Sequence, residues 1–330
     1  MALHLPDVAL VKDKEGRLVR KVLLRLFLLL VGGLVGTGVI EVGLRVLYPG
    51  SLLGAGQLRL TAGEQTYFQF DEEFGYMPRL GTQAYDTYGC VPNNYDVKDR
   101  KGRQRVLFVG DSVTHRGAIQ NGLQELYGDE HYEYWNAGVE SFNTAQVVAF
   151  YRRINYKVEP NQVVLTFHNN DFQDTPLVSQ EDGKLRIFMF GKDRERVNLW
   201  WFDNSYLYRW LIGIQLGRLD RSRQRQVVQQ SLRELKMLLA EQGVPLRAVI
   251  FPILLPLQEW REESRWSRQT SLEILREEGI ECIDLLPSLE QALAKGMVVQ
   301  QAPGDNWHPS VEAGRHFAKE LKSQNLLIEP

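Results

Sequence analysis

The chain has 330 residues, of which 44% are hydrophobic, 24% charged and 10% aromatic, and its formal net charge is -2. This length allows one large domain or two small ones, and the composition is that of a folded protein. The near-neutral charge provides no basic field, so nucleic acid is excluded as an expected partner. Cys90 and Cys282 do not form a CxxC pair and cannot make a zinc site by themselves.

The N-terminal region contains a long apolar stretch. Residues 22–40 are almost entirely apolar, and a modest extension reaches the length of about 20 residues that a membrane span needs. This extension includes Glu41 and Arg45, which lie four residues apart on one helical face. Basic residues outnumber acidic ones before the stretch, so the positive-inside rule predicts a cytoplasmic tail over residues 1–21. We therefore predict a single-pass transmembrane anchor over residues 22–48, with the rest of the chain outside the cytoplasm.

A cleaved signal peptide and a buried core helix are the alternatives to this anchor. A signal peptide needs a small-x-small cleavage site directly after the apolar run, where Glu41 and Arg45 stand instead. The basic flank and the terminal position argue against a core helix. Outside the cytoplasm, Cys90 and Cys282 would be free to form a disulfide, provided that their Cα atoms come close enough.

The remainder of the chain divides at about residue 104. Residues 49–103 predict a linker that becomes an N-terminal extension packed on the main domain, because aromatic residues occur there among glycine, proline and aspartate. From residue 104 onward, strand and helix patterns alternate. We expect strands at Arg105–Val109, Tyr132–Trp135, Gln162–Phe167, Leu246–Phe251 and Ile280–Ile283. We expect helices at Ala118–Tyr127, Thr144–Tyr156, Tyr206–Arg218, Arg223–Gln242, Glu259–Glu278, Leu289–Lys295 and Val311–Ser323.

This alternation indicates βαβ units joined by right-handed crossovers. The expected fold over residues 104–330 is therefore α/β, a three-layer flavodoxin-like sandwich with a mostly parallel five-stranded sheet. The transmembrane helix precedes this domain.

Polar residues follow several of the predicted strands. They are, in chain order, Gly110-Asp111-Ser112, Asn136-Ala137-Gly138 and His168-Asn169-Asn170-Asp171, with Asp305 and His308 directly before the last helix. The carboxyl ends of parallel strands converge on one crevice, so these side chains are expected to share one site. Acyl transfer needs a nucleophile, a base, an orienting acid and oxyanion donors, and this set contains each of them.

In order and spacing, the four segments resemble the blocks of the SGNH (GDSL-type) hydrolase superfamily, in a membrane-anchored bacterial type, over about residues 104–320. The resemblance implies that Ser112 is the nucleophile, His308 the base and Asp305 the acid that orients it. It also implies an oxyanion hole made by the Ser112 and Gly138 N–H groups and the Asn170 side chain.

Other polar residues near these blocks have expected roles of a different kind. Asp111 and Asp171 are expected to support the turns, and capping or turn formation remains the alternative role for each block residue. His168 stands where the family commonly has glycine, which predicts a wider side chain near the oxyanion hole. His115, three residues after Ser112, is a competing base. The histidines show no metal-ligand spacing, so neither a metal nor another cofactor is expected.

Residues 175–203 form a long connection, which is typical of a lid or binding loop. It contains Trp200 and Trp201, and other aromatic residues follow it. A sugar face, an acyl chain or the membrane surface would suit such side chains, and packing on the sheet is the alternative.

The resemblance implies a serine esterase that acts on O-acylated surface carbohydrate or lipid through an acyl-serine intermediate. One alternative is a polysaccharide O-acetyltransferase that uses the same residues and is supplied by a membrane-bound acyltransferase partner. A second alternative is a catalytically silent envelope scaffold. The complete set of Ser112, Asp305, His308 and Asn170 argues against the scaffold, whereas His168 leaves it open.

Overall fold

The computed structural model describes residues 8–47, 57–58, 64–181, 184–188, 197–216 and 221–329. Residues 1–7 of the predicted tail, 48–56 around the anchor and linker boundary, and 189–196 of the predicted lid lie outside these ranges. The chain forms two compact units. One comprises Met1–Gly56 and Glu195–Gly217, and the other comprises Gln57–Arg194 and Arg218–Pro330.

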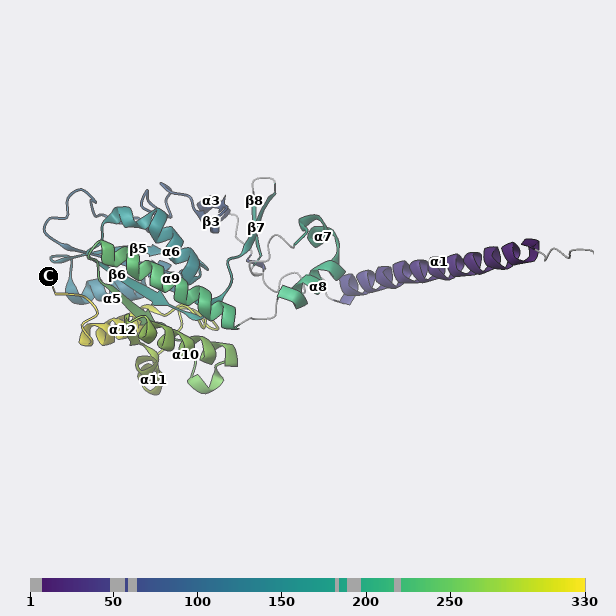
Figure 1. Ribbon diagram of the computed structural model, residues 1–330. Helices are drawn as coiled ribbons and strands as arrows, with labels where there is room; N and C mark the ends of the chain where they lie inside the picture. Colours follow the sequence, from purple (N-terminus) through teal and green to yellow (C-terminus); the bar gives the residue numbers. More distant parts are fainter. Residues whose placement is uncertain are drawn as a thin grey trace, which may run out of the picture. The chain divides into compact units, whose positions relative to one another are not determined.

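The larger unit contains a five-stranded parallel sheet between two layers of helices (Figure 1). Its strands are β4 (Gln104–Gly110), β5 (Tyr132–Gly138), β6 (Gln162–Phe167), β9 (Leu246–Ile250) and β10 (Glu281–Asp284). Their spatial order is β10-β9-β6-β4-β5, and every neighbouring pair is parallel. The predicted α/β class and flavodoxin-like strand order are therefore confirmed. The chain order reverses at β4 and β6, which is the switch point where such sheets bind ligands.

Helices cover both faces of the sheet. One layer consists of α6 (Thr144–Arg153), α9 (Arg221–Glu241) and α10 (Glu262–Glu277), and the other of α5 (Ala118–Tyr127), α11 (Leu286–Ala294) and α12 (Val311–Ser323). Leu107 and Val109 of β4 face the first layer, whereas Val106 and Phe108 face the second, as the two-residue period of a strand requires. This unit also contains the short helical turns α4 (Ser112–His115), η1 (Asn155–Val158), η2 (Asn169–Phe172) and η4 (Leu257–Glu259).

Two regions contain short strands that the periodicity did not predict. Between residues 64 and 78 lie α3 (Glu64–Tyr67), β2 (Phe68–Asp71) and β3 (Gly75–Pro78), and the last two pair as a hairpin. The long connection over residues 175–203 contains a second hairpin of β7 (Leu177–Glu181) and β8 (Lys184–Phe188). The short strand β1 (Gln57–Leu58) pairs with β8 and adds a third strand. Runs of four or five residues are too short for periodicity to separate strand from loop.

The two cysteines are free, so the disulfide considered above is absent. Cys90 is buried next to Val91, whose N–H donates to the Asn136 carbonyl on β5. Cys282 lies in β10 at the opposite edge of the sheet. Four interstrand spacings of about 4.8 Å separate these edges, whereas a disulfide requires Cα atoms within about 7 Å.

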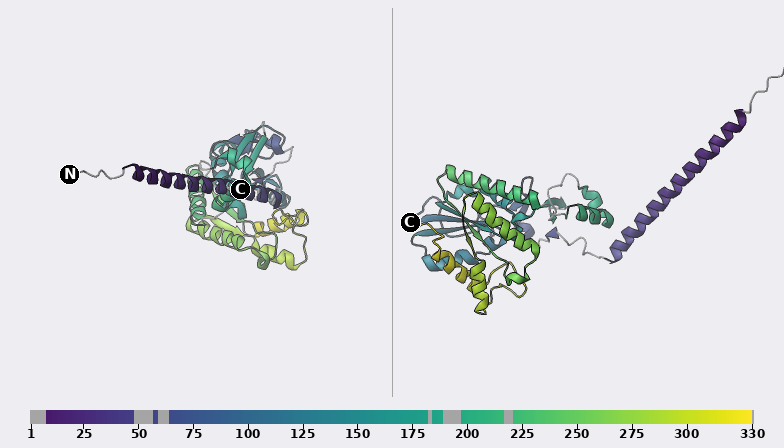
Figure 2. Two further views of the ribbon diagram at one scale, coloured as in Figure 1. Left: turned by 90° about the vertical axis from the view of Figure 1, so that its right-hand side faces the viewer. Right: turned by 60° about the horizontal axis from the view of Figure 1, so that its bottom comes forward.

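The smaller unit contains α1 (Val8–Leu47), α7 (Leu199–Asn204) and α8 (Tyr206–Leu216). Figure 2 shows α1 as one uninterrupted helix. Its segment Arg20–Leu47 is 28 residues long and apolar enough to cross a membrane, and its apolar 18-residue window is not buried within the protein. The predicted N-terminal apolar helix is therefore present.

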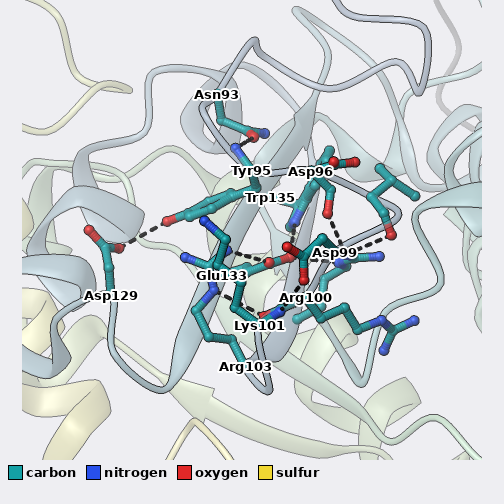
Figure 3. Close-up of polar contacts among 12 residues, drawn as sticks. Asn93, Tyr95, Asp96, Asp99, Arg100, Lys101, Arg103, Asp129, Glu133 and Trp135 are labelled. Carbon is teal, nitrogen blue, oxygen red and sulfur yellow. Dashed lines mark hydrogen bonds and ion pairs between the residues drawn. The ribbon is translucent and has the colours of Figure 1, made fainter.

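A buried ion pair joins the amino-terminal ends of β4 and β5. Arg105 and Glu133 are direct partners in the sheet register, both are fully buried, and Arg105 Nε lies 2.7 Å from Glu133 Oε2. Trp135 and Arg103 donate to the same carboxylate at 3.0 and 2.8 Å (Figure 3). The remaining Arg105 N–H groups donate to the carbonyls of Val158, Asp96 and Val97. The pair thus connects two strands, η1 and the N-terminal extension.

We predict that Glu133→Ala lowers the free energy of unfolding by about 3–5 kcal/mol, because it leaves the Arg105 charge buried without its partner. The measurement is denaturant unfolding of the full chain in detergent, followed by intrinsic fluorescence. Glu159→Ala is the matched control, since it breaks the exposed pair with Arg100 and should cost less than about 1 kcal/mol. Equal losses in the two variants would contradict a special role for the buried pair.

Candidate active site

The turn after β4 presents Ser112. A Cβ at Gly110 would lie 2.4 Å from Thr114 Oγ1 and 2.9 Å from the Thr166 carbonyl oxygen, so the turn has room only for glycine. Asp111 then caps α4 by accepting the Val113 N–H at 2.9 Å. Ser112 is the first residue of α4 and is half-buried.

A chain of three polar side chains begins at this serine. Ser112 Oγ lies 3.0 Å from His308 Nε2, and His308 Nδ1 lies 2.9 Å from Asp305 Oδ2. The serine comes from the end of β4, whereas the other two residues come from the loop directly before α12. The structure therefore brings together the three residues expected to act as nucleophile, base and acid.

The Asp305 carboxylate also holds the loop that carries it. Its Oδ1 accepts the backbone N–H groups of Trp307 and His308, each at 3.1 Å. Partial burial raises the pKa of Asp305, but hydrogen bonds from the His308 side chain and from these two N–H groups outweigh it and lower the pKa below its ordinary value. The carboxylate is therefore ionised at neutral pH, facing the imidazole.

His115 is oriented away from a role as base. Its Nδ1 lies 3.2 Å from the Gly138 carbonyl oxygen and 3.2 Å from the Tyr85 hydroxyl. Burial lowers the pKa of His115, so its ring is neutral at neutral pH. Because His308, and not His115, hydrogen-bonds to Ser112, His308 occupies the position of a general base.

The two expected oxyanion donors beyond Ser112 have different partners. Asn170, in η2, donates from Nδ2 to the Phe142 carbonyl at 3.1 Å, and its side chain is also in hydrogen-bond contact with the buried Asp111 carboxyl. Gly138 N–H donates to Asn136 Oδ1 at 3.0 Å and is therefore already engaged. A Cβ at Gly138 would lie 2.2 Å from the backbone nitrogen of His115, so only glycine lets β5 pack this closely against α4.

Ser141 is a residue that the sequence analysis missed. It lies in the loop after β5, next to the Phe142 carbonyl that Asn170 contacts, and its φ of 60° is in the left-handed region. Within the described parts of the chain, the N–H of this half-buried residue has no hydrogen-bond acceptor. The loop thus holds a serine in a strained conformation one residue before Phe142, whose carbonyl accepts the Asn170 side chain. The signal in the sequence is weak, because serine does not mark a positive φ as glycine would.

The two expected supporting aspartates are both buried. Asp111 is 2% exposed, and burial raises the pKa of this carboxyl. Asp171 accepts the Thr144 hydroxyl at 2.6 Å and the His168 N–H, and burial raises its pKa well above the ordinary value. Each carboxyl binds a backbone N–H of a site turn, and neither contacts Ser112 or His308 through a hydrogen bond.

His168 packs behind the site. The ring is 5% exposed, its Nδ1 lies 3.1 Å from the Phe251 carbonyl oxygen, and Trp307 meets it edge-on with centroids 5.5 Å apart. Burial lowers the pKa of His168, so it is neutral. The wider side chain expected at this position therefore packs against the ring of Trp307. Trp307 lies between Asp305 and His308 in sequence.

Among the residues that the structure describes, no group of three or more metal-ligating side chains occurs.

No protein-family model and no curated protein matches the chain. One similar solved structure is LAE5, an alpha/beta hydrolase from the metagenome of Lake Arreo in Spain. It is 13% identical, with a TM-score of 0.46, and the alignment covers 68% of this chain and 97% of that one.

Two acetylxylan esterases are similar at the same level. Axe2 from Geobacillus stearothermophilus is 14% identical, with a TM-score of 0.43 and coverage of 66% of this chain and 93% of that one. AlAXEase is 14% identical, with a TM-score of 0.42 and coverage of 67% and 98%. Similarity of this degree does not identify an activity.

We predict that Ser141→Gly raises the free energy of unfolding by about 1 kcal/mol, because glycine adopts a positive φ without the steric cost that serine bears. Denaturant unfolding of the full chain in detergent measures this change. The same replacement in the middle of α9, Ser231→Gly, should instead lower stability by about 0.5–1 kcal/mol. Destabilisation by Ser141→Gly would show that its side chain, not its backbone, matters.

Proposed function

We propose that this protein is a membrane-anchored serine esterase of the SGNH (GDSL-type) class. The observation that carries the proposal is the hydrogen-bonded chain from Ser112 through His308 to Asp305, with links of 3.0 and 2.9 Å. These three hydrogen-bonded side chains lie where β4 ends, at the switch point of a parallel sheet. A serine, an imidazole in hydrogen-bond contact with it and an ionised carboxylate, in this order, are the parts of a nucleophilic triad.

The proposed reaction proceeds in two halves. Ser112 Oγ attacks the ester carbonyl while His308 Nε2 accepts the serine proton, and the same proton then passes to the leaving alcohol. Asp305 keeps the Nδ1 proton in place and stabilises the imidazolium. Water, activated by His308, then hydrolyses the acyl-serine and returns the enzyme to its starting state.

Three N–H donors are proposed to stabilise the tetrahedral oxyanion. Two are the Ser112 backbone and the Asn170 side chain. For the third, we propose Ser141 in preference to Gly138, because the Gly138 N–H is engaged by Asn136. Loss of one such donor typically costs about 3–4 kcal/mol of transition-state stabilisation.

An O-acylated carbohydrate is the substrate that the surroundings favour. Trp307 is 42% exposed beside His308, and an exposed indole provides a flat apolar face on which a sugar ring can stack. A cleft of about 340 Å³ is lined mainly by amide and tyrosine side chains and includes His115, three residues after Ser112. This polar lining suits a sugar better than a lipid chain.

Transfer of the acyl group to a second sugar, as an O-acetyltransferase would perform, uses the same residues and differs only in the acceptor. The polar cleft beside α4 provides space for such an acceptor. A silent scaffold is disfavoured because it would not need an intact hydrogen-bonded chain at Ser112. Assays with and without a polysaccharide acceptor, which track the acetyl group, separate hydrolysis from transfer.

The proposed location is the outer face of a membrane. Arg20–Leu47 is long and apolar enough to span a bilayer, and basic residues dominate before it. The larger unit would then face outward, toward surface polysaccharide, and a membrane-bound acyltransferase is the partner that the transfer reaction would require.

We predict that Ser112→Ala and His308→Ala each lower kcat/KM for p-nitrophenyl acetate by at least about 10³-fold in the full chain in detergent, because each removes a triad member. His115→Asn is the control and should change the rate by less than about 10-fold. Equal rates for Ser112→Ala and the parent chain would overturn the esterase assignment. Loss of activity only in the His115 variant would reassign the base.

We predict that Trp307→Ala raises KM for an O-acetylated oligosaccharide by about 3- to 10-fold, which corresponds to about 0.5–1.5 kcal/mol of aromatic contact. Its rate on p-nitrophenyl acetate should stay within about threefold of the parent, because the backbone N–H that binds Asp305 is retained. Trp307→Phe should restore most of the oligosaccharide affinity. Equal losses on both substrates would indicate a purely structural role.

A further inference from the structure

The charged residues near the end of α1 have partners far along the chain. The Glu41 carboxylate accepts the Tyr206 N–H at 2.8 Å, the Leu207 N–H at 2.9 Å and the Ser205 hydroxyl at 2.9 Å. These are donors at the start of α8, which have no partner within that helix. Glu41 therefore caps α8 across more than 160 positions of sequence.

Arg45 strengthens the same junction. Its Nε lies 2.8 Å from Glu41 Oε1, and its Nη2 donates to the Asn204 carbonyl at 2.7 Å. Its guanidinium also lies over the Tyr206 ring, 5.2 Å from the centroid. The carbonyl at the end of α7 and the N–H groups at the start of α8 are thus both bound to one turn of α1.

The position of Glu41 along α1 gives the depth of this junction in a membrane. From Arg20 to Glu41 the helix rises about 32 Å, at about 1.5 Å per residue. The hydrocarbon core of a bilayer is about 30 Å thick. If Arg20 lies at one surface, Glu41 therefore reaches the opposite boundary between hydrocarbon and headgroups. The apolar segment continues for only six more residues, to Leu47.

The α7–α8 hairpin exposes large apolar side chains at this junction. Trp200 is 63% exposed, Trp201 51%, Leu211 50% and Trp210 39%. Tryptophan is enriched at membrane–water interfaces, where its ring is buried among headgroups and its N–H stays hydrated. An apolar surface of this kind on one short hairpin marks an interaction site.

We infer that the α7–α8 hairpin is a second membrane-binding element, which inserts its tryptophans into the headgroup region while Glu41 and Arg45 fix it to the transmembrane helix. The occupant of its apolar surface is lipid, because the hairpin is hydrogen-bonded to a helix of membrane-spanning length at the depth where headgroups begin. The inference rests on the proposed membrane anchoring, and it is independent of the esterase activity.

The test uses the full chain in proteoliposomes of phosphatidylcholine with or without dibrominated acyl chains, which quench nearby tryptophans. None of the seven tryptophans lies in α1. We expect clear quenching in the parent chain and its loss in the triple variant Trp200→Phe, Trp201→Phe, Trp210→Phe. Trp307→Phe, which removes an exposed tryptophan of the larger unit, should leave the quenching unchanged. Absence of quenching in the parent, or its persistence in the triple variant, would overturn the inference.

A second pair of variants tests the link to α1. Glu41→Leu removes the cap and keeps the helix apolar, and it should reduce the quenching at least twofold. Val42→Leu, at an exposed neighbouring position, should not. Unchanged quenching in Glu41→Leu would overturn the docking role. Extraction with alkaline carbonate separates the two proposals: release of the chain would overturn the membrane anchor and this inference together, whereas retention without quenching would overturn this inference alone.

Discussion

The ion pair between Arg105 and Glu133 is the constraint on which the rest of the larger unit depends. These residues are register partners at one end of β4 and β5, and Gly110 and Gly138 are partners at the other end. A slip of one residue in either strand would separate the two buried charges and would turn the side chains of that strand to the opposite face of the sheet. The register that determines which residues flank Ser112 is therefore fixed at the end of the strand pair that lies away from it.

The distance between Ser112 and His308 depends on a second close contact. Ser112 precedes α5 in sequence and His308 precedes α12, and these two helices approach each other through glycines. A Cβ at Gly314 would lie 2.6 Å from the Ala118 carbonyl oxygen, and one at Gly122 would lie 2.8 Å from the Ala318 Cβ. Because both helices are packed at backbone distance, the loops before them are held together, and the 3.0 Å contact of Ser112 with His308 follows.

Much of this arrangement could be predicted from the sequence, because it depends on the regular spacing of hydrophobic residues in strands and helices and on the order of the polar segments between them. The five strands of the parallel sheet and most of the helices around it follow from hydrophobic periodicity. Ser112 and Asn170 follow from the ends of predicted strands, and Asp305 and His308 follow from their place before the last helix. What could not be predicted depends on individual contacts. The Asn136 amide that engages Gly138 and the positive φ of Ser141 leave no trace in composition. The partners of Glu41 lie more than 160 residues away, so the residue was apparent only as a charge in an apolar helix.

The division of the chain into two units has a consequence for how the larger unit is connected to α1. Residues 195–217 interrupt the sheet domain and belong with α1, so the polypeptide passes between the units three times, near residues 56, 194 and 217. A single proteolytic cut before β1 would therefore leave the larger unit joined to residues 195–217, which belong with α1. A fragment that starts at residue 57 would carry α8 without its Glu41 cap, together with the exposed Trp200, Trp201 and Trp210. Such a fragment would tend to self-associate through this apolar surface, which the proposed membrane contact would cover.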